Sequence, residues 1–254
     1  MRADMPLAGH NILVTGATGG IGAPLVECLA QMGAKPIIHY GRNRAAAETL
    51  LDRISGQGWI VEADLTRPDE AFALWNRAIS AAGRIHALVN SAGIRSEVAL
   101  DADPSLWRDV WQKEFQVNFF AAADLCREAI QHFKAHDGGR IVNLSSRAGE
   151  RGYEGPAMAY GASKAAILNL TKSIARSFGA DQIVAVAVAP GWVRTRMVEG
   201  LIAERGEAAA VADVPIGKMA DPMAVAELIA FVLQPSQASL NGATLDVNGG
   251  SYIR

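Results

Sequence analysis

The sequence predicts a single α/β domain, residues 1–254, built on a doubly wound parallel sheet of about seven strands with helices on both faces. Three observations predict this class. Short, continuously apolar runs alternate with longer helical segments along the whole chain, as they do when strands are buried on both faces. A glycine-rich turn joins the first run to the first helical segment. No linker-like stretch divides the 254 residues, a length that one large α/β domain accommodates.

The strands and helices are read from these runs and from helix-start and helix-stop residues. Aspartate followed by proline, at positions 103–104 and 221–222, is typical of a helix start. Residues 66–69 are read in the same way, with Pro68 in the first turn, and Gly179 is read as a helix stop. Strands are expected at residues 11–15, 35–40, 59–63, 87–90, 140–145, 183–189 and 243–247. Helices are expected at residues 21–32, 45–54, 66–83, 103–133, 157–178 and 221–233.

Composition argues against several classes of protein. The net charge of −2 gives no electrostatic case for binding nucleic acid or an anionic membrane surface. No apolar run is long enough to span a bilayer and residues 1–6 lack a signal-peptide core, so a cytoplasmic location is expected. Cys28 and Cys126 fall in apolar helical patterns and are read as buried hydrophobic residues. The five histidines show no paired ligand spacing, so no metal site is expected.

The turn after the first strand reads Thr15-Gly16-Ala17-Thr18-Gly19-Gly20-Ile21-Gly22. Small residues there let backbone N–H groups approach a pyrophosphate at the positive end of a helix. The spacing is G-x-x-x-G-x-G and so differs from the G-x-G-x-x-G fingerprint. A tight turn packed against a strand also requires glycine, so both interpretations stay open. The strand before the turn and the helix after it favour phosphate binding.

The end of the second strand bears on which dinucleotide is bound. An acidic residue there hydrogen-bonds a ribose 2′-hydroxyl, whereas an arginine meets a 2′-phosphate. The strand runs into Gly41-Arg42-Asn43-Arg44, with no Asp or Glu. Arg42 offers a bidentate, charge-assisted contact to phosphate, with a solvated loop arginine as the alternative. NADP(H) is therefore the favoured cofactor, and NAD(H) is the alternative.

A hydroxyl, a phenol and an ammonium follow the fifth strand. Ser145 and Ser146 lie at the end of that strand, and a short Gly-rich loop at residues 150–158 precedes Tyr160. Tyr160 and Lys164 are four residues apart in a helical segment, so their side chains share one face. A cation one turn from a phenol favours the phenolate and is expected to lower the pKa of Tyr160. These groups suit proton transfer between an alcohol and a carbonyl, a reaction that also needs a hydride partner.

Several short motifs recur in order along nearly the whole chain. T-G-x-x-x-G-x-G spans residues 15–22, and N-N-A-G appears at residues 90–93 with Ser91 replacing the second asparagine. Tyr-x-x-x-Lys is residues 160–164, Pro-Gly is residues 190–191, and a characteristic strand and tail occupies residues 241–250. Together they resemble the classical short-chain dehydrogenase/reductase family. The resemblance implies a Rossmann-like fold and an NAD(P)-dependent oxidoreductase.

The resemblance also implies a role for each matching residue. Tyr160 would be the general acid in reduction and the base in oxidation, while Lys164 would lower its pKa and hold the nicotinamide ribose. Ser146 is taken as the catalytic serine, although the 14 positions to Tyr160 exceed the family spacing by one. Asn118 would support a water-linked proton path to the lysine, with a helix kink as its alternative role. Asp64 would bond the adenine amino group or cap the next helix. The implied cofactor contacts are Gly16, Thr18, Gly20, Ile21, Gly22, Arg42, Asp64, Leu65, Asn90, Ala92, Gly93, Tyr160, Lys164, Pro190, Gly191, Val193 and Thr195.

The substrate is read from the segment after the Pro-Gly motif. Residues 192–217 are expected to form a mobile helical lid over a largely apolar pocket. Arg95 and Arg194 are read as solvated surface residues rather than anion-binding ones. The expected substrate is a small carbonyl or alcohol compound. The expected substrate contacts are Ser146, Ala148, Tyr153, Tyr160, Trp192 and Met197.

The overall pattern is most similar to 3-oxoacyl-acyl-carrier-protein reductases, with sugar or alcohol dehydrogenases of the same family as the alternative. A non-catalytic dinucleotide sensor is a second class, disfavoured because Ser146, Tyr160 and Lys164 are all present. Helices at residues 107–133 and 157–178 carry apolar residues over more than one face. With the family resemblance, this favours a homotetramer built on those two helices.

Overall fold

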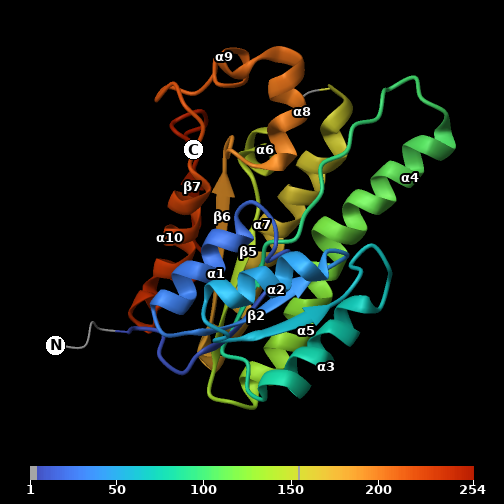
Figure 1. Ribbon diagram of the computed structural model, residues 1–254. Coiled ribbons are helices and arrows are strands. Elements are labelled where there is room, and N and C mark those ends of the chain that lie inside the picture. The colour runs from blue at the N-terminus through green and yellow to red at the C-terminus, as the bar shows by residue number, and fades with distance from the viewer. Residues whose placement is uncertain (1–4, 154) are drawn as a thin grey trace.

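A computed structural model describes residues 5–153 and 155–254 (Figure 1). The described strands form one sheet in the order β3-β2-β1-β4-β5-β6-β7, with parallel pairing throughout. The doubly wound parallel sheet expected from the sequence is therefore confirmed. Residues 1–4, which belong to the segment read for a signal peptide, lie outside the described residues. The strands are β1 Asn11–Val14, β2 Lys35–Tyr40, β3 Trp59–Glu62, β4 Ala87–Asn90, β5 Gly139–Leu144, β6 Ile183–Pro190 and β7 Thr244–Val247.

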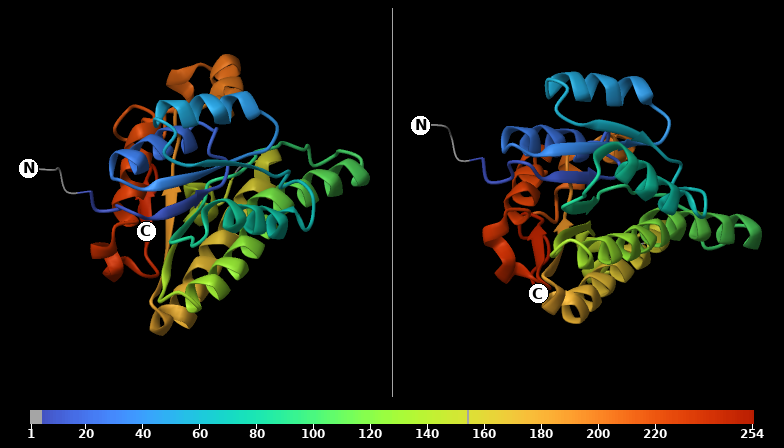
Figure 2. Two further views of the ribbon diagram at one scale, coloured as in Figure 1. Left: turned by 60° about the horizontal axis from the view of Figure 1, so that its bottom comes forward. Right: turned by 90° about the horizontal axis from the view of Figure 1, so that it is seen from below.

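Helices cover both faces of the sheet (Figure 2). Residues of β1 alternate between the two layers: Ile12 and Val14 pack in one apolar cluster and Leu13 packs in the other. This is why the strands read as continuous apolar runs. The first layer contains α1 Gly22–Gln31, α2 Arg44–Arg53 and α10 Pro222–Val232. The second contains α3 Glu70–Ala82, α5 Ala121–Lys134 and α7 Met158–Phe178.

The strand order places the candidate site. The chain starts at β1, winds outwards through β2 and β3, and then returns to pair β4 with the other side of β1. The loops after β1 and β4 therefore leave the sheet in opposite directions, and a crevice opens at the carboxyl edge between them. The turn after β1 and the segments that follow β2, β4, β5 and β6 all reach this edge.

The helix expected from residue 103 to 133 is interrupted. Asp103 caps α4 Pro104–Phe115, as its side chain accepts a hydrogen bond from Ser105 N–H at 2.8 Å. A π-helical turn, Gln116–Phe120, then separates α4 from α5. Asn118 lies in this turn and bonds to the backbone of Ile94. Such π turns occur often at functional sites.

One helix-boundary prediction is wrong and another is confirmed. The third helix begins at Glu70, so Pro68 lies in the preceding turn, and Asp69 has a left-handed φ of 68° and makes no side-chain cap. The helix that was expected to stop at Gly179 does end at Phe178, although Gly179 has a φ of −60° and is not left-handed. The chain continues in a short 3-10 turn, and Gln182, with a φ of 60°, takes the left-handed position instead.

A Gly-rich loop was expected at residues 150–158, but α6 Arg147–Arg151, capped by Ser146, extends into the start of it. A side chain on Gly149 would come within 2.6 Å of the Lys164 backbone. Glycine is therefore required here for close contact between two helices. The segment after β6 holds α8 Arg196–Arg205 and α9 Glu207–Ala210. Within the described part of the chain, no helix combines the length and the apolar character needed to cross a membrane.

Candidate active site

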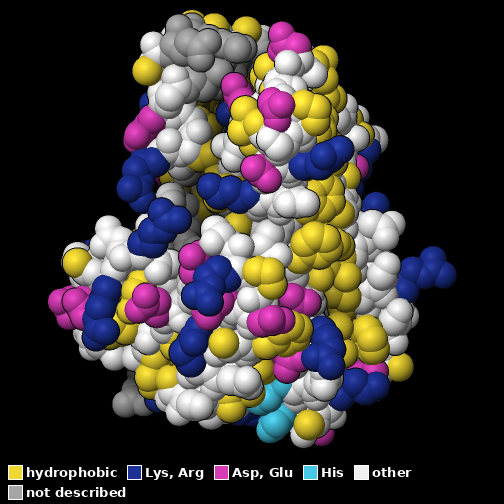
Figure 3. Space-filling model, turned by 90° about the vertical axis from the view of Figure 1, so that its right-hand side faces the viewer, with side chains coloured by type: hydrophobic (Ala, Val, Ile, Leu, Met, Phe, Trp, Pro, Cys, Tyr) yellow, Lys and Arg dark blue, Asp and Glu magenta, His cyan; other side chains and the backbone are white. Residues whose placement is uncertain are grey.

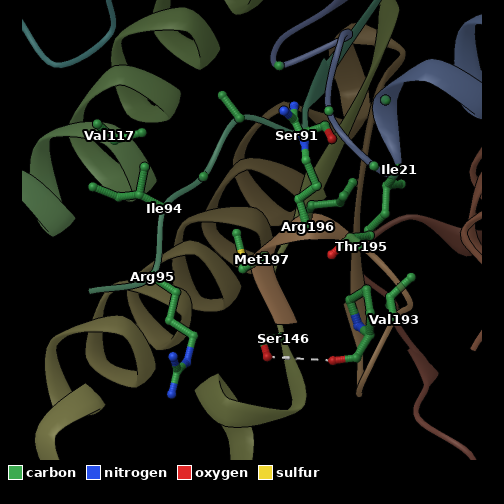
Figure 4. A pocket seen from close by; sticks show the side chains of 18 of the residues that line it. Ile21, Ser91, Ile94, Arg95, Val117, Ser146, Val193, Thr195, Arg196 and Met197 are labelled. Carbon is green, nitrogen blue, oxygen red and sulfur yellow. Dashed lines mark hydrogen bonds between the residues drawn. The ribbon is translucent and has the colours of Figure 1, made fainter. Parts of the chain in front are cut away.

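A cavity of about 490 Å³ lies at the carboxyl edge of the sheet (Figure 4). The residues that follow β1, β2 and β3 line one part of it, and those that follow β4, β5 and β6 line the rest. Arg42 after β2 and Ser146 after β5 are three strands apart, which corresponds to about 14 Å across the sheet. The cavity is thus long enough for an extended dinucleotide. Predicted site residues that line it are Gly16, Thr18, Gly20, Ile21, Gly22, Arg42, Asp64, Leu65, Ala92, Gly93, Ser146, Tyr153, Tyr160, Lys164, Pro190, Gly191, Trp192, Val193, Thr195 and Met197.

The glycine turn fits both interpretations that the sequence left open, tight packing and phosphate binding. Gly16 has a left-handed φ of 62°, and a side chain on Gly22 would lie 2.7 Å from Ala17 Cα. A side chain on Gly20 would come within 2.6 Å of Thr195 Cβ, on the opposite wall of the cavity. Ile21 gives α1 no side-chain cap, and the first turn of that helix lines the cavity. The turn therefore packs tightly and also presents a helix N-terminus that fits a pyrophosphate.

Asp64 and Arg42 lie at the same end of the cavity. The Asp64 carboxylate accepts hydrogen bonds from Thr66 N–H at 3.1 Å and from Thr66 Oγ–H at 2.7 Å. These bonds are the main reason that the pKa of Asp64 is lowered, and the charges of Arg42 and Arg67 add to them. Asp64 thus stabilises the turn after β3 by hydrogen bonds, a role similar to the helix cap considered above. It also lines the cavity.

His39 is a site residue that the sequence reading missed. Its Nδ1 accepts a hydrogen bond from Gly16 N–H at 3.0 Å, and its Nε2 lies 3.1 Å from the Ala63 carbonyl oxygen, so Nε2 carries the proton. Burial lowers the pKa of His39 to about 4. A neutral imidazole therefore joins the ends of β1, β2 and β3. The sequence feature that could have indicated this role is a histidine near the end of an otherwise apolar strand.

The two adjacent serines have different partners. Ser145 Oγ–H donates to the Lys164 carbonyl oxygen at 2.7 Å and so ties β5 to α7. Ser146 Oγ accepts from Ala148 N–H at 3.1 Å and donates to the Pro190 carbonyl oxygen at 3.5 Å (Figure 4). A hydrogen bond between Ser146 and Tyr160 also contributes to the pKa of the phenol. This geometry favours Ser146 over Ser145 as the hydroxyl that faces the reaction.

The expected lowering of the Tyr160 pKa is wrong for the protein alone. Burial raises the pKa of Tyr160 to about 12, and the Ser146 hydrogen bond is the largest opposing effect. Lys164 Nζ is 5.8 Å from the centre of the Tyr160 ring and donates to the Leu144 carbonyl oxygen at 2.9 Å. Burial also lowers the pKa of Lys164 itself, to about 8. Desolvation therefore outweighs the ammonium charge that the sequence argument relied on.

Three predicted site residues do not line the cavity. Asn118 is 2% exposed and makes its bonds inside the protein. Asn90 is buried under the sheet edge, where its side chain donates to Asn143 Oδ1 at 2.8 Å. Ala148, a residue of α6, is also buried. Asn118 stays close to the cavity because it bonds to Ile94, which lines it. The side chains of Asn90 and Ala148 lie inside the protein.

Charged residues also enter the substrate end of the cavity. The expectation that Arg95 is a solvated surface residue is wrong, because its side chain is only 15% exposed and lines the cavity. Arg95 Nε–H donates to Tyr153 Oη at 3.2 Å, and the Tyr153 and Tyr160 rings are 5.9 Å apart. Arg147 is buried, with its guanidinium 5.5 Å from the centre of the Trp192 ring. Further lining residues that the sequence reading missed are Gly19, His39, Gly41, Ala63, Thr66, Ser91, Ile94, Val117, Leu144, Ser145, Arg196 and Val198.

Arg194 behaves as the sequence reading expected. It is exposed and pairs with Glu207 of α9. Arg95 and Arg194 both lie near site motifs in the sequence, yet only Arg95 lines the cavity. Position in the sequence therefore did not distinguish a cavity arginine from a surface arginine.

Known proteins resemble this chain over nearly its full length. A family model described as enoyl-(acyl carrier protein) reductase matches residues 16–252. The 3-oxoacyl-[acyl-carrier-protein] reductase FabG of Vibrio cholerae is 33% identical, over 98% of this chain and 100% of that protein. Cis-4-hydroxycyclohexanecarboxylate dehydrogenase of Sinomonas cyclohexanicum is 37% identical over 94% of each. A solved short-chain dehydrogenase/reductase from Serratia marcescens is 29% identical with a TM-score of 0.88, covering 97% of this chain and 99% of that one.

These likenesses agree with the motifs and with the residues gathered around the cavity. The relatives are named as reductases and dehydrogenases, so the sensor alternative is set aside in favour of an enzyme. This chain belongs to the short-chain dehydrogenase/reductase family and is an oxidoreductase that acts on alcohol or carbonyl groups with a nicotinamide dinucleotide.

Proposed function

We propose that this chain interconverts a carbonyl and a secondary alcohol with NADP(H), most like a 3-oxoacyl-acyl-carrier-protein reductase. The observation that carries the proposal is the shared cavity, which joins Arg42 and the glycine turn to Ser146, Tyr160 and Lys164. A long dinucleotide fits such a cavity with its reactive ring beside proton-transferring side chains. The proposed cofactor contacts are those predicted residues that line the cavity.

The side chains of the catalytic end would work as a unit. The bound cofactor supplies or accepts a hydride at the reacting carbon. Ser146 and Tyr160 would hold the substrate oxygen, and Tyr160 would give it a proton in reduction and take one back in oxidation. Lys164, with a pKa of about 8, is mostly protonated at neutral pH and places a positive charge one helical turn from the phenol. Asn118, which does not line the cavity, would keep the residues around it in place through its hydrogen bonds.

The preference for NADP(H) over NAD(H) is supported by Arg42. This guanidinium lines the cavity just after β2, where an arginine meets a 2′-phosphate. Binding of NADPH and NADH, measured separately, tests the preference. A clearly tighter binding of NADH would contradict it.

For the substrate, the relatives give the leading class and Arg95 gives a second one. Full-length likeness to 3-oxoacyl-[acyl-carrier-protein] reductases supports a 3-oxoacyl thioester. Arg95 lies close to Tyr153 in the cavity wall and also pairs with Glu97 at 2.5 Å. If a substrate replaces Glu97 at this guanidinium, it would carry an anionic group, as in an alcohol dehydrogenase acting on a hydroxycarboxylate. The test is NADPH oxidation with 3-oxoacyl thioesters, 4-oxocyclohexanecarboxylate and neutral ketones. No turnover of any carbonyl would contradict the proposed function.

We also propose that residues 192–217 act as a substrate lid. The two ends of the segment are tied together, because Val193 forms a bridge with Ala220 and Ala220 N–H donates to the Trp192 carbonyl oxygen at 2.8 Å. Between these ends, Met197 and Val198 reach the cavity from α8. A segment anchored at its base and packed over a pocket suits opening and closing.

The homotetramer is likewise a proposal, and the helices α4, α5 and α7 support it. Aromatic side chains follow one another along α4 and the π turn, from Trp107 and Trp111 to Phe120, which is 49% exposed. Figure 3 looks onto this side of the molecule and shows hydrophobic side chains gathered in a band. Exposed apolar area of this kind marks an interface. Light scattering at micromolar concentration tests the assembly, and a monomer mass would contradict it.

A further inference from the structure

Glu114 is a buried ionisable residue that the proposed reaction leaves unused. It lies in the last turn of α4 and is 0% exposed, and α4 buries no other residue to this degree. A carboxyl group removed from water is costly unless it is paired or hydrogen-bonded. The position therefore calls for a physical explanation.

The hydrogen bonds around Glu114 favour its ionised form and oppose the effect of burial, which raises the pKa of the carboxyl group. One carboxylate oxygen accepts a bond from Ser96 N–H, and the other accepts from Asn118 Nδ2–H at 2.8 Å. The Asn118 amide cannot be turned round, because its Oδ1 accepts from Ile94 N–H at 2.8 Å. Both oxygens of Glu114 thus face donors, which favours the charged form over the protonated one.

Asn118 connects this carboxylate to α7. Its Nδ2 also lies 3.1 Å from Ser163 Oγ, and Ser163 in turn donates to the Tyr160 carbonyl oxygen at 2.8 Å. A side chain on Gly93 would lie 3.3 Å from Asn118 Oδ1 and 3.4 Å from Lys164 Nζ, so these two head groups converge over one glycine. Glu114 therefore reaches the neighbourhood of Lys164 through a single intervening side chain.

The charges of Glu114 and Lys164 act on each other. Burial raises the pKa of Glu114 and lowers that of Lys164, and the charge of each residue opposes the shift of the other. No direct ion pair joins the two in the part of the chain that the structure describes. Other titratable groups that face this site are Tyr160 of α7, Tyr153 of the preceding loop and Arg95 of the loop after β4.

We propose that Glu114 is a positioning residue of the active site: its buried carboxylate fixes the Asn118 amide and supplies the negative charge opposite the Lys164 ammonium. The inference builds on the proposed function, since it explains how a fully buried lysine keeps the positive charge that proton transfer uses. It moves no proton itself and adds no step to the reaction.

The test is the titration of Lys164 in the cofactor-free protein. Lysine labelled with ¹³C at Cε gives one NMR signal per residue, and the Lys164 signal is identified by its absence from Lys164→Met. In Glu114→Gln the shape is kept and the charge is lost, so the Lys164 midpoint is expected to fall by about one pH unit or more. Glu128→Gln, on α5 and outside this network, is the matched control and is expected to leave the midpoint unchanged.

Two further measurements separate charge from shape. Glu114→Asp keeps the charge and is expected to leave the Lys164 midpoint near the wild-type value. The pH profile of kcat/KM is expected to shift in Glu114→Gln by the same amount as the Lys164 midpoint. An unchanged Lys164 midpoint in Glu114→Gln, or a midpoint that falls equally in Glu114→Asp, would overturn the proposal. Because the titration requires no turnover, its result is independent of whether the proposed reaction is correct.

Discussion

The cofactor half and the substrate half of the cavity are held in shape by different means. Around the ends of β1, β2 and β3, backbone groups approach closely at Gly16 and Gly22, and the neutral His39 ring joins the three strand ends. Around the ends of β5 and β6, side chains from distant segments meet, as where Arg147 pairs with Asp213 at 3.1 Å. The first half is therefore a rigid backbone cradle, while the second depends on side-chain partners that are free to vary with the substrate.

Tyr160→Phe is expected to break the catalytic end alone and to give the largest effect. Removing the phenolic proton should lower turnover by about 10²–10⁴-fold. NADPH binding should be retained, since the glycine turn and Arg42 are untouched and Tyr160 is only one of the proposed cofactor contacts. Stopped-flow turnover and fluorescence titration of NADPH measure the two effects. Tyr252→Phe is the matched control, and near-normal turnover in Tyr160→Phe would rule out the assignment.

Arg42→Met is expected to damage the cofactor half and to leave the catalytic residues intact. Loss of a charge-assisted contact to a 2′-phosphate corresponds to about 1.5–3 kcal/mol, so the NADPH dissociation constant should rise roughly 10- to 100-fold. NADH binding should change little. Arg44→Met, two residues away and paired with Glu48 in solvent, is the control. Equal losses for NADPH and NADH would show that Arg42 does not read the phosphate.

Gly22→Ala tests whether the cradle is as tight as the structure indicates. The added methyl group would lie 2.7 Å from Ala17 Cα, so the turn must shift, at a cost of about 1–3 kcal/mol in unfolding free energy. Urea denaturation measures it. Gly200→Ala in α8 meets nothing within 4 Å and should be neutral or slightly stabilising. Equal stability of both variants would argue against a tight cradle.

The smallest effect concerns pH and His39. The pKa of His39 is about 4 in the folded protein, against about 6.5 for a free histidine. The folded state therefore binds fewer protons than the unfolded one between these values. The contribution of neutral His39 is complete above about pH 6.5 and falls by about 1.4 kcal/mol per pH unit as the pH drops towards 4.

Urea denaturation at several pH values checks the His39 prediction. His86 and His132 also have lowered pKa values, so the difference between wild type and His39→Asn isolates the effect of His39. The acid-side slope should be smaller in the variant. Identical slopes would mean that His39 is not held neutral by the fold.

The sequence was sufficient for the sheet and for most of the cavity lining, because these depend on local patterns. Apolar runs, glycine spacing and Asp-Pro helix starts each act within a few residues. It was insufficient where the deciding partner is distant in sequence. The short helix α6 was not predicted, because the contact between Gly149 and Lys164, fifteen positions apart, was not visible. The helix start at residues 66–69 was wrong, since Asp69 adopts a left-handed φ and α3 begins only at Glu70.

Burial was the other physical quantity that the sequence could not supply. The spacing of Tyr160 and Lys164 was correct, but the direction of the Tyr160 pKa depended on desolvation. Arg95 and Arg194 are equally charged in the sequence, and only the fold places the first in the cavity wall. Glu114 drew no attention because an acidic residue in an exposed-looking helix is ordinary until it proves to be fully buried.

The measurement that tests this account most directly is a crystal structure with NADP(H) bound. We expect the nicotinamide ring beside Ser146 and Tyr160, its ribose at Lys164, and the 2′-phosphate at Arg42. A cofactor bound elsewhere, or Tyr160 and Lys164 turned away from the nicotinamide, would contradict the account.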